Sequence, residues 1–92
     1  MPKQNYIYIL QCADGTLYTG WTSDLNSRIT AHNKGVGAKY TKPRLPVILV
    51  HSEVFESNSE ALKRELEIKK LNRRQKLELI KTATFNKIKA EK

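Results

Sequence analysis

The chain contains little of what several common kinds of protein need. Its 92 residues include one cysteine and two histidines. A single cysteine cannot form an internal disulfide, and these three side chains are too few for a structural zinc site with four ligands. The first residues form no apolar segment of the kind found in secretory signals, and no hydrophobic run is long enough to span a membrane. We therefore expect a cytoplasmic protein.

The length also limits the architecture. It suffices for one domain but not for a two-domain enzyme with a separate cofactor lobe. Apolar residues make up 39% and charged residues 28% of the chain, a balance typical of a small globular domain rather than a disordered chain. We expect a single domain over residues 1–84 and a basic, frayed C-terminal tail over residues 85–92.

Positive charge is unevenly distributed along the chain. Seventeen Lys and Arg residues against nine Asp and Glu residues give a net charge of +8. Residues 1–56 carry six basic and four acidic side chains (+2), whereas residues 57–92 carry eleven and five (+6). A basic half favours a polyanionic partner, and nucleic acid is the commonest polyanion in a cytosol. A lysine-rich helical surface that keeps the protein soluble would have the same charge.

The first part of the chain predicts a β-hairpin followed by a helix. Residues 6–10 are aromatic and β-branched, as in a strand buried on both faces, and residues 17–21 return after Asp14-Gly15, a pair that suits a tight two-residue turn. We expect the helix over about residues 24–34, capped by Ser23 or Asp24 and ended by Gly35.

Two polar residues of this helix lie on its apolar side. Arg28 and His32 are four positions apart and share the helical stripe of Leu25 and Ile29. A helix that exposed its polar residues would place them on the opposite side. Arg28 and His32 are therefore expected to point toward the hairpin.

The remaining residues predict one strand and two helices. After a flexible basic loop over residues 35–44, an apolar strand begins at Leu45 and can extend to Phe55. Ser57 and Glu60 fit a capping box before a helix over about residues 59–71, and Asn72 ends that helix before another over about residues 73–82. The expected core positions of the two helices are Ala61, Leu62, Leu66, Ile68, Leu77 and Ile80. The order ββαβαα defines an α+β fold, with a small three-stranded antiparallel sheet flanked by helices.

An ordered set of motifs resembles the GIY-YIG nuclease superfamily. Tyr6-Ile7-Tyr8 and Tyr18-Thr19-Gly20 stand at the spacing of the two motifs that name the superfamily, with Tyr in place of the first Gly and Thr in place of the second Ile. Arg28 and His32 match the Arg and, in several branches, the His of the following helix. The segment 61–65 resembles the one that carries the metal-binding Glu. The likeness covers roughly residues 5 to 80 and is closest to short stand-alone bacterial members.

The resemblance implies metal-dependent endonuclease activity on DNA, with structured or damaged DNA in repair or recombination as a substrate. Its catalytic residues would be Tyr8, Tyr18, Arg28 and His32. Glu65 would bind one Mg²⁺ or Mn²⁺ ion, and Gly20 would let the helix and the substrate approach the strand closely. Glu65 could instead simply pair with Lys69, four residues further on.

These residue types suit phosphodiester hydrolysis. The reaction needs a base for water and cations for the charge that develops on the phosphate. A phenol titrates near about 10 and becomes a base only where cations favour phenolate. Arg28 and the metal ion would supply that bias, and either Tyr8 or Tyr18 could be the base.

Cations outside the motifs would hold the backbone of the nucleic acid. The expected contacts are Lys39, Lys42, Arg44, Arg73, Arg74 and Lys76. Such contacts carry little information about base sequence, so we expect weak sequence preference or recognition of shape. Two other functions stay open at this point: a non-catalytic nucleic-acid-binding module with the nuclease fold, and a domain that binds a protein partner through its basic face.

Overall fold

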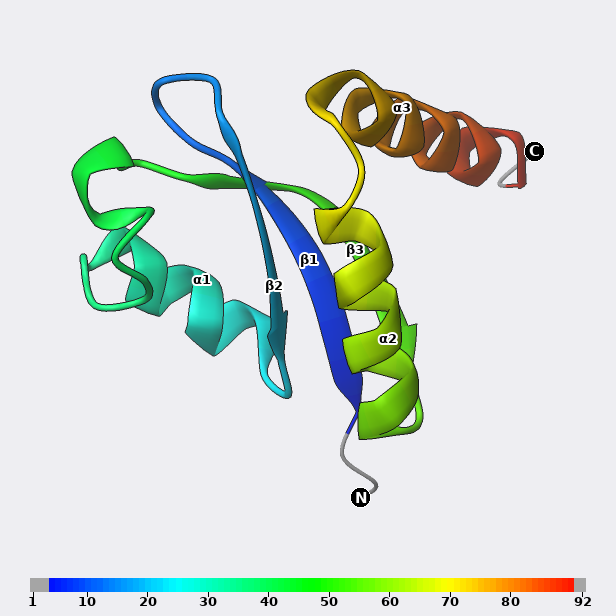
Figure 1. Cartoon of the computed structure of the whole chain (residues 1–92), viewed down its shortest axis with the longest axis horizontal. Coiled ribbons are helices and arrows are strands. Elements are labelled where there is room, and N and C mark those ends of the chain that lie inside the picture. The colour runs from blue at the N-terminus through cyan, green and yellow to red at the C-terminus, as the bar shows by residue number, and fades with distance from the viewer. Residues whose placement is uncertain (1–3, 91–92) are drawn as a thin grey trace.

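The computed structural model describes residues 4–90, with the side chains of residues 4–83. This part of the chain forms a three-stranded antiparallel sheet between helices (Figure 1). β1 (Asn5–Gln11) is the central strand and pairs with β2 (Leu17–Thr22) on one side and β3 (Ile48–Phe55) on the other. The order ββαβαα and the α+β class predicted from the sequence are confirmed.

The hairpin between β1 and β2 has a longer turn than the sequence predicted. Cys12 N donates a hydrogen bond to Thr16 O (2.9 Å), so three residues rather than two form the loop. Gly15 N donates to Cys12 O, and Gly15 has a φ of 84°. Asp14 Oδ1 accepts a hydrogen bond from Thr16 N (3.1 Å). A turn closed by a left-handed glycine is the usual three-residue hairpin loop, so Asp14-Gly15 marked the position of the turn but not its length.

The first helix, α1 (Leu25–Asn33), has the ends that the sequence predicted. Asp24 is the N-cap, with its carboxylate accepting a hydrogen bond from Ser27 N (3.2 Å). Gly35, with a φ of 82°, lies just beyond the helix in the left-handed conformation that only glycine adopts without strain. His32 is fully buried against the sheet, as expected from its place on the apolar stripe.

β3 begins at Ile48 rather than at Leu45, so the predicted start was wrong. The backbone just before the strand is held by α1 instead of by the sheet. Asn33 Oδ1 accepts a hydrogen bond from Val47 N (2.8 Å), and Asn33 Nδ2 donates to Val47 O (3.2 Å). A short 3₁₀ helix (Lys42–Arg44) also interrupts the predicted loop.

The last two helices are separated as predicted, but α3 is longer. α2 (Asn58–Lys69) begins after Ser57, whose Oγ accepts a hydrogen bond from Glu60 N (3.2 Å). Asn72 then caps α3 (Arg73–Ala90) by accepting a hydrogen bond from Gln75 N (2.8 Å). No Gly or Pro follows Asn72, so nothing ends the helix at residue 82. Residues 91–92 of the expected tail lie outside the described residues.

Two clusters of buried side chains pack on opposite faces of the sheet. The cluster on the α2 face consists of Ile7, Ile9, Ala61 and Ile68. The cluster on the α1 face consists of Tyr8, Leu10, Cys12 and Val47. Figure 1 shows α1 and α2 on the two sides of the strands. Successive residues of β1 therefore contribute to different layers, since side chains alternate along a strand.

Three leucines that the sequence placed in the core are exposed. Leu62, Leu66 and Leu77 have 45%, 59% and 44% of their surface accessible. Ala61 and Ile68, seven residues apart, face the sheet in α2, which turns the stripe of Leu62 and Leu66 away from it. Among the described residues, no helix has the length and apolar character needed to cross a bilayer.

Candidate active site

The ring of Tyr8 on β1 extends over the neighbouring strand β2 at Gly20, a residue without a side chain. Tyr8 and Gly20 are direct partners in the antiparallel register. A Cβ atom at Gly20 would lie 2.5 Å from Tyr8 Oη and 2.6 Å from Tyr8 Cζ. The sequence predicted that Gly20 permits a close approach at the site, and the structure shows that the group it makes room for is the phenol ring of Tyr8.

The hydroxyl of Tyr8 is the first member of a buried hydrogen-bonded chain. Tyr8 Oη is 2.9 Å from His32 Nε2, and His32 Nδ1 is 2.8 Å from Thr41 Oγ1. All three side chains are almost completely buried. Sequence reasoning found Tyr8 and His32 but missed Thr41, because a single threonine in a basic loop carries no periodic or motif signal.

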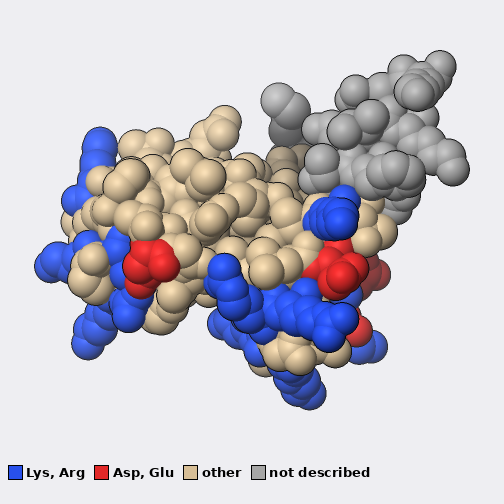
Figure 2. Space-filling model, turned by 90° about the horizontal axis from the view of Figure 1, so that it is seen from above, with Lys and Arg blue, Asp and Glu red and all other residues tan. Residues whose placement is uncertain are grey.

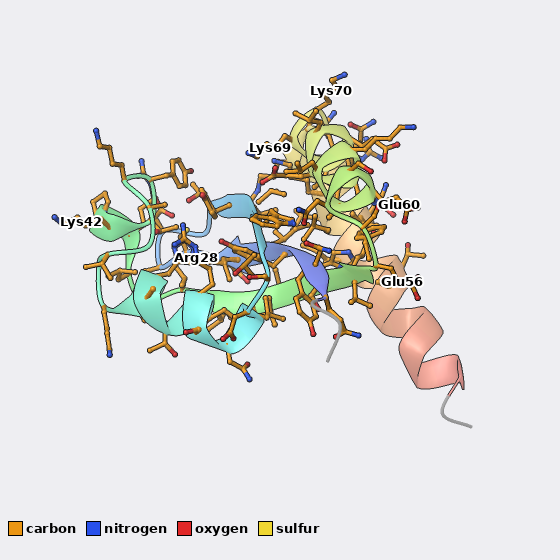
Figure 3. The ribbon with its side chains drawn as sticks, turned by 90° about the horizontal axis from the view of Figure 1, so that it is seen from below. Arg28, Lys42, Glu56, Glu60, Lys69 and Lys70 are labelled. Carbon is orange, nitrogen blue, oxygen red and sulfur yellow. The ribbon has the colours of Figure 1, made fainter. Side chains whose placement is uncertain are left out.

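Arg28 fixes the loop that covers His32. Its Nη2 donates a hydrogen bond to Gly37 O (2.7 Å). Gly37 lies so close to the imidazole that a Cβ atom there would collide with His32 Nδ1. Figure 3 shows Arg28 on the inner side of α1, whereas Lys42 points outward from the loop. The loop predicted to be flexible is therefore tied down at the site.

The surroundings of the two titratable groups keep both of them neutral. Burial lowers the pKa of His32, and the positive charge of Arg28 lowers it further. Burial raises the pKa of Tyr8 above its usual value, against a hydrogen bond and a charge from Arg28 that lower it. The charge of Glu65 also raises the pKa of Tyr8, which places this carboxylate within electrostatic range of the phenol.

Tyr18 meets the same cluster through ring contacts. Its ring centroid is 5.4 Å from that of His32 and 6.4 Å from that of Tyr8. On its other side Tyr40 stacks at 5.9 Å with an interplanar angle of 22°, and the Arg44 guanidinium lies 4.1 Å from the Tyr40 centroid. The sequence predicted neither the place of Tyr40 in this cluster nor the cation–π contact between Arg44 and Tyr40.

Glu65 projects from α2 with 15% of its side chain exposed. Its Oε2 is 3.4 Å from Lys69 Nζ, so the ion pair considered as the alternative to a metal role is present. Among the described residues, no group of three or more His, Cys, Asp or Glu side chains could hold a metal ion. One carboxylate nevertheless suits Mg²⁺ or Mn²⁺, since hard cations complete their coordination with water and phosphate oxygens. The single carboxylate of Glu65 is therefore compatible with such an ion.

The six cations expected to hold a nucleic acid differ in their surroundings. Lys39 and Lys42 are exposed. Arg44 is committed within the fold, because it pairs with Asp14 Oδ2 (3.0 Å) and donates to Tyr40 O (2.6 Å). Figure 2 shows Lys and Arg in two groups along one side of the molecule, separated by a hollow.

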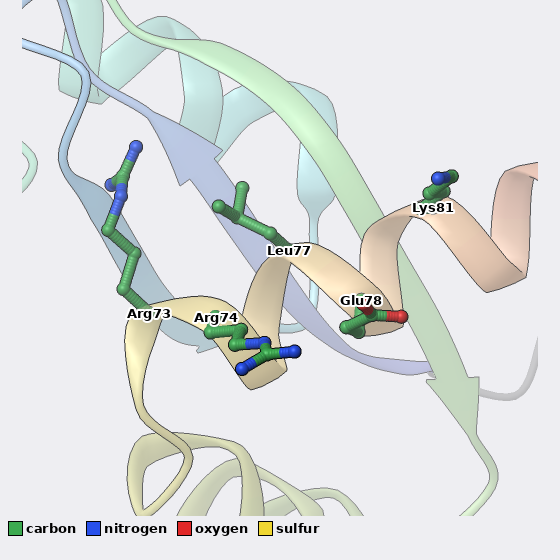
Figure 4. A pocket seen from close by; sticks show the side chains of 5 residues that line it. All are labelled: Arg73, Arg74, Leu77, Glu78 and Lys81. Atoms are coloured by element: carbon green, nitrogen blue, oxygen red, sulfur yellow. The ribbon is translucent and has the colours of Figure 1, made fainter.

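The cations of α3 lie along a groove at the start of the helix. Arg73 Nη1 donates a hydrogen bond to Gly15 O (2.7 Å), which joins α3 to the hairpin turn. The groove has a volume of about 490 Å³ and is lined by Arg73, Arg74, Leu77, Glu78 and Lys81 (Figure 4). Lys76 lines a smaller hollow with Arg73, Thr16 and Leu17. Arg73, Arg74, Lys76 and Lys81 therefore give the first turns of α3 a positively charged surface beside the hairpin turn.

The fold and the clustered side chains are those of a small nuclease-like domain, and comparisons with known proteins define the family. The GIY-YIG catalytic domain matches residues 4–78. A UPF0213 protein of Staphylococcus aureus is 57% identical over 77 residues, which are 84% of this chain and 94% of that protein. The chain belongs to the GIY-YIG family, as the motifs predicted.

Two solved structures share the fold. The solution structure of a UPF0213 protein from Bacillus halodurans is 47% identical, with a TM-score of 0.58 over 86% of this chain and 84% of that chain. The solution structure of a protein from E. faecalis is also 47% identical, with a TM-score of 0.64 over 90% of this chain and 88% of that chain. Short bacterial relatives of this kind agree with the predicted likeness to stand-alone members of the family.

Proposed function

We propose that this protein is a metal-dependent endonuclease that hydrolyses phosphodiester bonds in DNA, in the cytoplasm. Family membership supports the nuclease class. The observation that carries the proposal is the buried contact of Tyr8 Oη with His32 Nε2 at 2.9 Å, beside Arg28 and within range of the charge of Glu65. A merely binding surface would not need a phenol and an imidazole sealed against each other.

Of the two tyrosines that the sequence left open, Tyr8 is the proposed base, because its hydroxyl contacts His32. Because burial raises its pKa, the phenol rests in its neutral form, and its own proton must leave as the proton of water arrives. His32 Nε2 is placed to receive that proton. The water oxygen then bonds to phosphorus, and the bond to the leaving oxygen breaks with its electron pair. Tyr18, held by ring contacts, orients the water or the phosphate.

Arg28 is the proposed phosphate clamp. Its guanidinium donates to Gly37 O and hydrogen-bonds the Tyr8 phenol, and its remaining N–H donors would bind phosphate oxygens as a fork. Glu65 would hold one Mg²⁺ or Mn²⁺ ion. When bound, such an ion neutralises charge on the phosphate oxygens of the substrate.

Exposed cations on the loop and α3 are the proposed contacts to the DNA backbone. Lys39 and Lys42 flank the site from the loop, and the groove beside Arg73 and Arg74 extends the positive surface. Contacts of this kind position DNA by shape rather than by base sequence. The proposed substrates are therefore structured or damaged DNA of repair and recombination, with a protein partner supplying further targeting.

The proposal is tested with a panel of labelled duplex, branched, nicked and single-stranded DNA, together with RNA, in Mg²⁺, Mn²⁺ or EDTA. Glu65→Ala is compared with Glu67→Ala, which removes a carboxylate two residues away that is 60% exposed. We expect metal-dependent products from the wild type and Glu67→Ala but none from Glu65→Ala.

The panel also separates the alternatives. Absence of metal-dependent products from the wild type on every substrate would overturn the proposal. Salt-sensitive binding without products would then identify a nucleic-acid-binding module. Binding to an acidic protein but to neither DNA nor RNA would identify a partner-binding domain.

A further inference from the structure

The hydroxyl of Thr41 has two neighbours and only one proton to give. Its Oγ1 is 2.8 Å from His32 Nδ1 and donates at 3.2 Å to Ala38 O. A carbonyl oxygen can only accept a hydrogen bond, whereas a hydroxyl can donate one and accept others. If the proton of Thr41 goes to Ala38 O, then Thr41 Oγ1 must accept from His32, and the imidazole must carry its proton on Nδ1.

The other end of the chain requires the same tautomer. The phenol proton of Tyr8 needs an acceptor, and the guanidinium of Arg28 beside it has only donors. The acceptor that the structure offers to Tyr8 is His32 Nε2 at 2.9 Å. A neutral imidazole has one donor and one acceptor, so an accepting Nε2 again leaves the proton on Nδ1.

We propose that Thr41 is a positioning residue that fixes the Nδ1–H tautomer of His32 and thereby keeps Nε2 free to accept the proton of Tyr8. The inference rests on the proposed function. As the Tyr8 O–H bond breaks, its electron pair stays on oxygen and takes up the proton of water. The lone pair of Nε2 forms the new N–H bond, and as the bond to phosphorus breaks the imidazolium passes its extra proton through solvent to the leaving oxygen.

The loop around Thr41 is built to hold this arrangement. Ala38 O accepts a second hydrogen bond, from Lys42 N (3.1 Å), so the carbonyl that orients Thr41 is itself fixed. Gly37 packs directly on the imidazole and is tethered through its carbonyl oxygen to Arg28. A carboxylate or carbonyl is the common partner that fixes a histidine tautomer; here a buried threonine hydroxyl would take that role.

The test reads the tautomer directly, by ¹⁵N NMR of the His32 side chain in the full-length protein. We expect a protonated Nδ1 and an unprotonated Nε2 in the wild type. Thr41→Val keeps the shape of the side chain but removes the hydroxyl, and it should shift the ring toward Nε2–H and lower the cleavage rate about 100-fold. Thr41→Ser, which restores the hydroxyl, should recover both the Nδ1–H signal and most of the rate.

Thr30→Val is the matched control, because Thr30 is an exposed residue of α1 whose hydroxyl donates to Asn26 O. It should change neither the tautomer nor the rate. An Nε2–H ring in the wild type would overturn the inference, as would an unchanged Nδ1–H ring in folded Thr41→Val. If Thr41→Val does not fold, the wild-type spectrum and the rate of Thr41→Ser still test the inference. A His32 ring that has lost Nδ1–H in Thr41→Ser would overturn it. A wild type that cleaves nothing but shows Nδ1–H would overturn the proposed function while leaving the tautomer assignment standing.

Discussion

Both faces of the sheet bury side chains, but the two faces are held together differently. On the α2 face, Ile7 and Ile9 pack against aliphatic side chains and have no exposed surface. On the α1 face, Tyr8 alternates with them on the same strand, yet it packs beside His32 and Thr41, which are also buried. Burying a polar group costs free energy unless it is hydrogen-bonded, whereas burying an isoleucine is favourable in itself.

This difference assigns separate tasks to neighbouring residues of β1. The aliphatic face provides stability, and the hydrogen-bonded face holds the proposed catalytic groups in fixed positions at little net gain in stability. Substitutions on the α1 face should therefore lower the cleavage rate with little loss of stability. Substitutions on the α2 face should lower stability with little loss of cleavage.

The largest effect is expected from Arg28→Ala, on the polar face. The substitution removes the proposed phosphate clamp and the tether to Gly37 O, so the cleavage rate should fall about 1000-fold. The far-ultraviolet circular dichroism spectrum should stay unchanged, because neither core cluster includes Arg28. Cleavage within a few-fold of the wild type would show that Arg28 does not bind the reacting phosphate.

Ile9→Ala should lower stability without lowering the cleavage rate of the folded protein. It removes a fully buried side chain from the α2-face cluster and should lower the free energy of unfolding by about 2–5 kcal/mol. Below its unfolding transition the variant should cleave like the wild type. Ile48→Ala, at a position 59% exposed on β3, is the control and should change stability by less than about 0.5 kcal/mol. Urea unfolding measures both, and equal losses would contradict the division between the faces.

The parts of the structure that the sequence predicts are those governed by neighbours along the chain. The caps at Asp24 and Ser57 and the stop at Gly35 depend on adjacent residues, and all three lie where they were predicted. The inward direction of Arg28 and His32 follows from helical spacing, and the family motifs named Tyr8 and Gly20.

Features decided by contacts distant in sequence could not be predicted in this way. β3 starts late because Asn33 holds the backbone of Val47, fourteen residues further on. Leu62 is exposed because the small Ala61 beside it, not the larger side chain, fits against the sheet. Thr41 contacts His32 only because the loop folds back over the imidazole ring.

Gly20→Ala is expected to lower both stability and cleavage moderately. The added Cβ would lie 2.5 Å from Tyr8 Oη, so the phenol must move away from His32. We expect a loss of about 1–3 kcal/mol in stability from overpacking and a clear loss of cleavage. In a Tyr8→Ala background the same substitution should cost almost no stability, because the clashing ring is gone. Additive losses in the double variant would contradict this explanation.

The smallest effect is expected at Glu53, a residue of β3 that accepts hydrogen bonds from Arg64 of α2. Burial would raise the pKa of Glu53, but hydrogen bonds from Arg64 (2.9 and 3.1 Å) and His51 (2.7 Å) outweigh it and hold the pKa below its usual value. Because the folded-state pKa is depressed, this stabilisation is present above the ordinary carboxyl pKa and is lost as the pH falls through the folded-state value.

Glu53→Gln should therefore lose stability near neutral pH and show a flatter decline in acid than the wild type. Urea unfolding at a series of pH values measures this difference. A Glu53→Gln variant whose stability follows the wild-type pH curve would show that the contact between β3 and α2 does not depend on this carboxylate.

Removing the hydroxyl of Tyr8 is the most direct test of the central claim, which is that the buried polar face performs the chemistry. Tyr8→Phe removes one oxygen atom from the contact with His32, and Tyr6→Phe removes the same atom two residues away, where the hydroxyl donates to Gln4 Oε1 at an exposed position. The cleavage rate of the two variants on the best substrate of the DNA panel is compared under identical metal conditions. We predict a loss of about 100-fold or more for Tyr8→Phe and a wild-type rate for Tyr6→Phe. A Tyr8→Phe protein that cleaves as fast as the wild type would contradict the account.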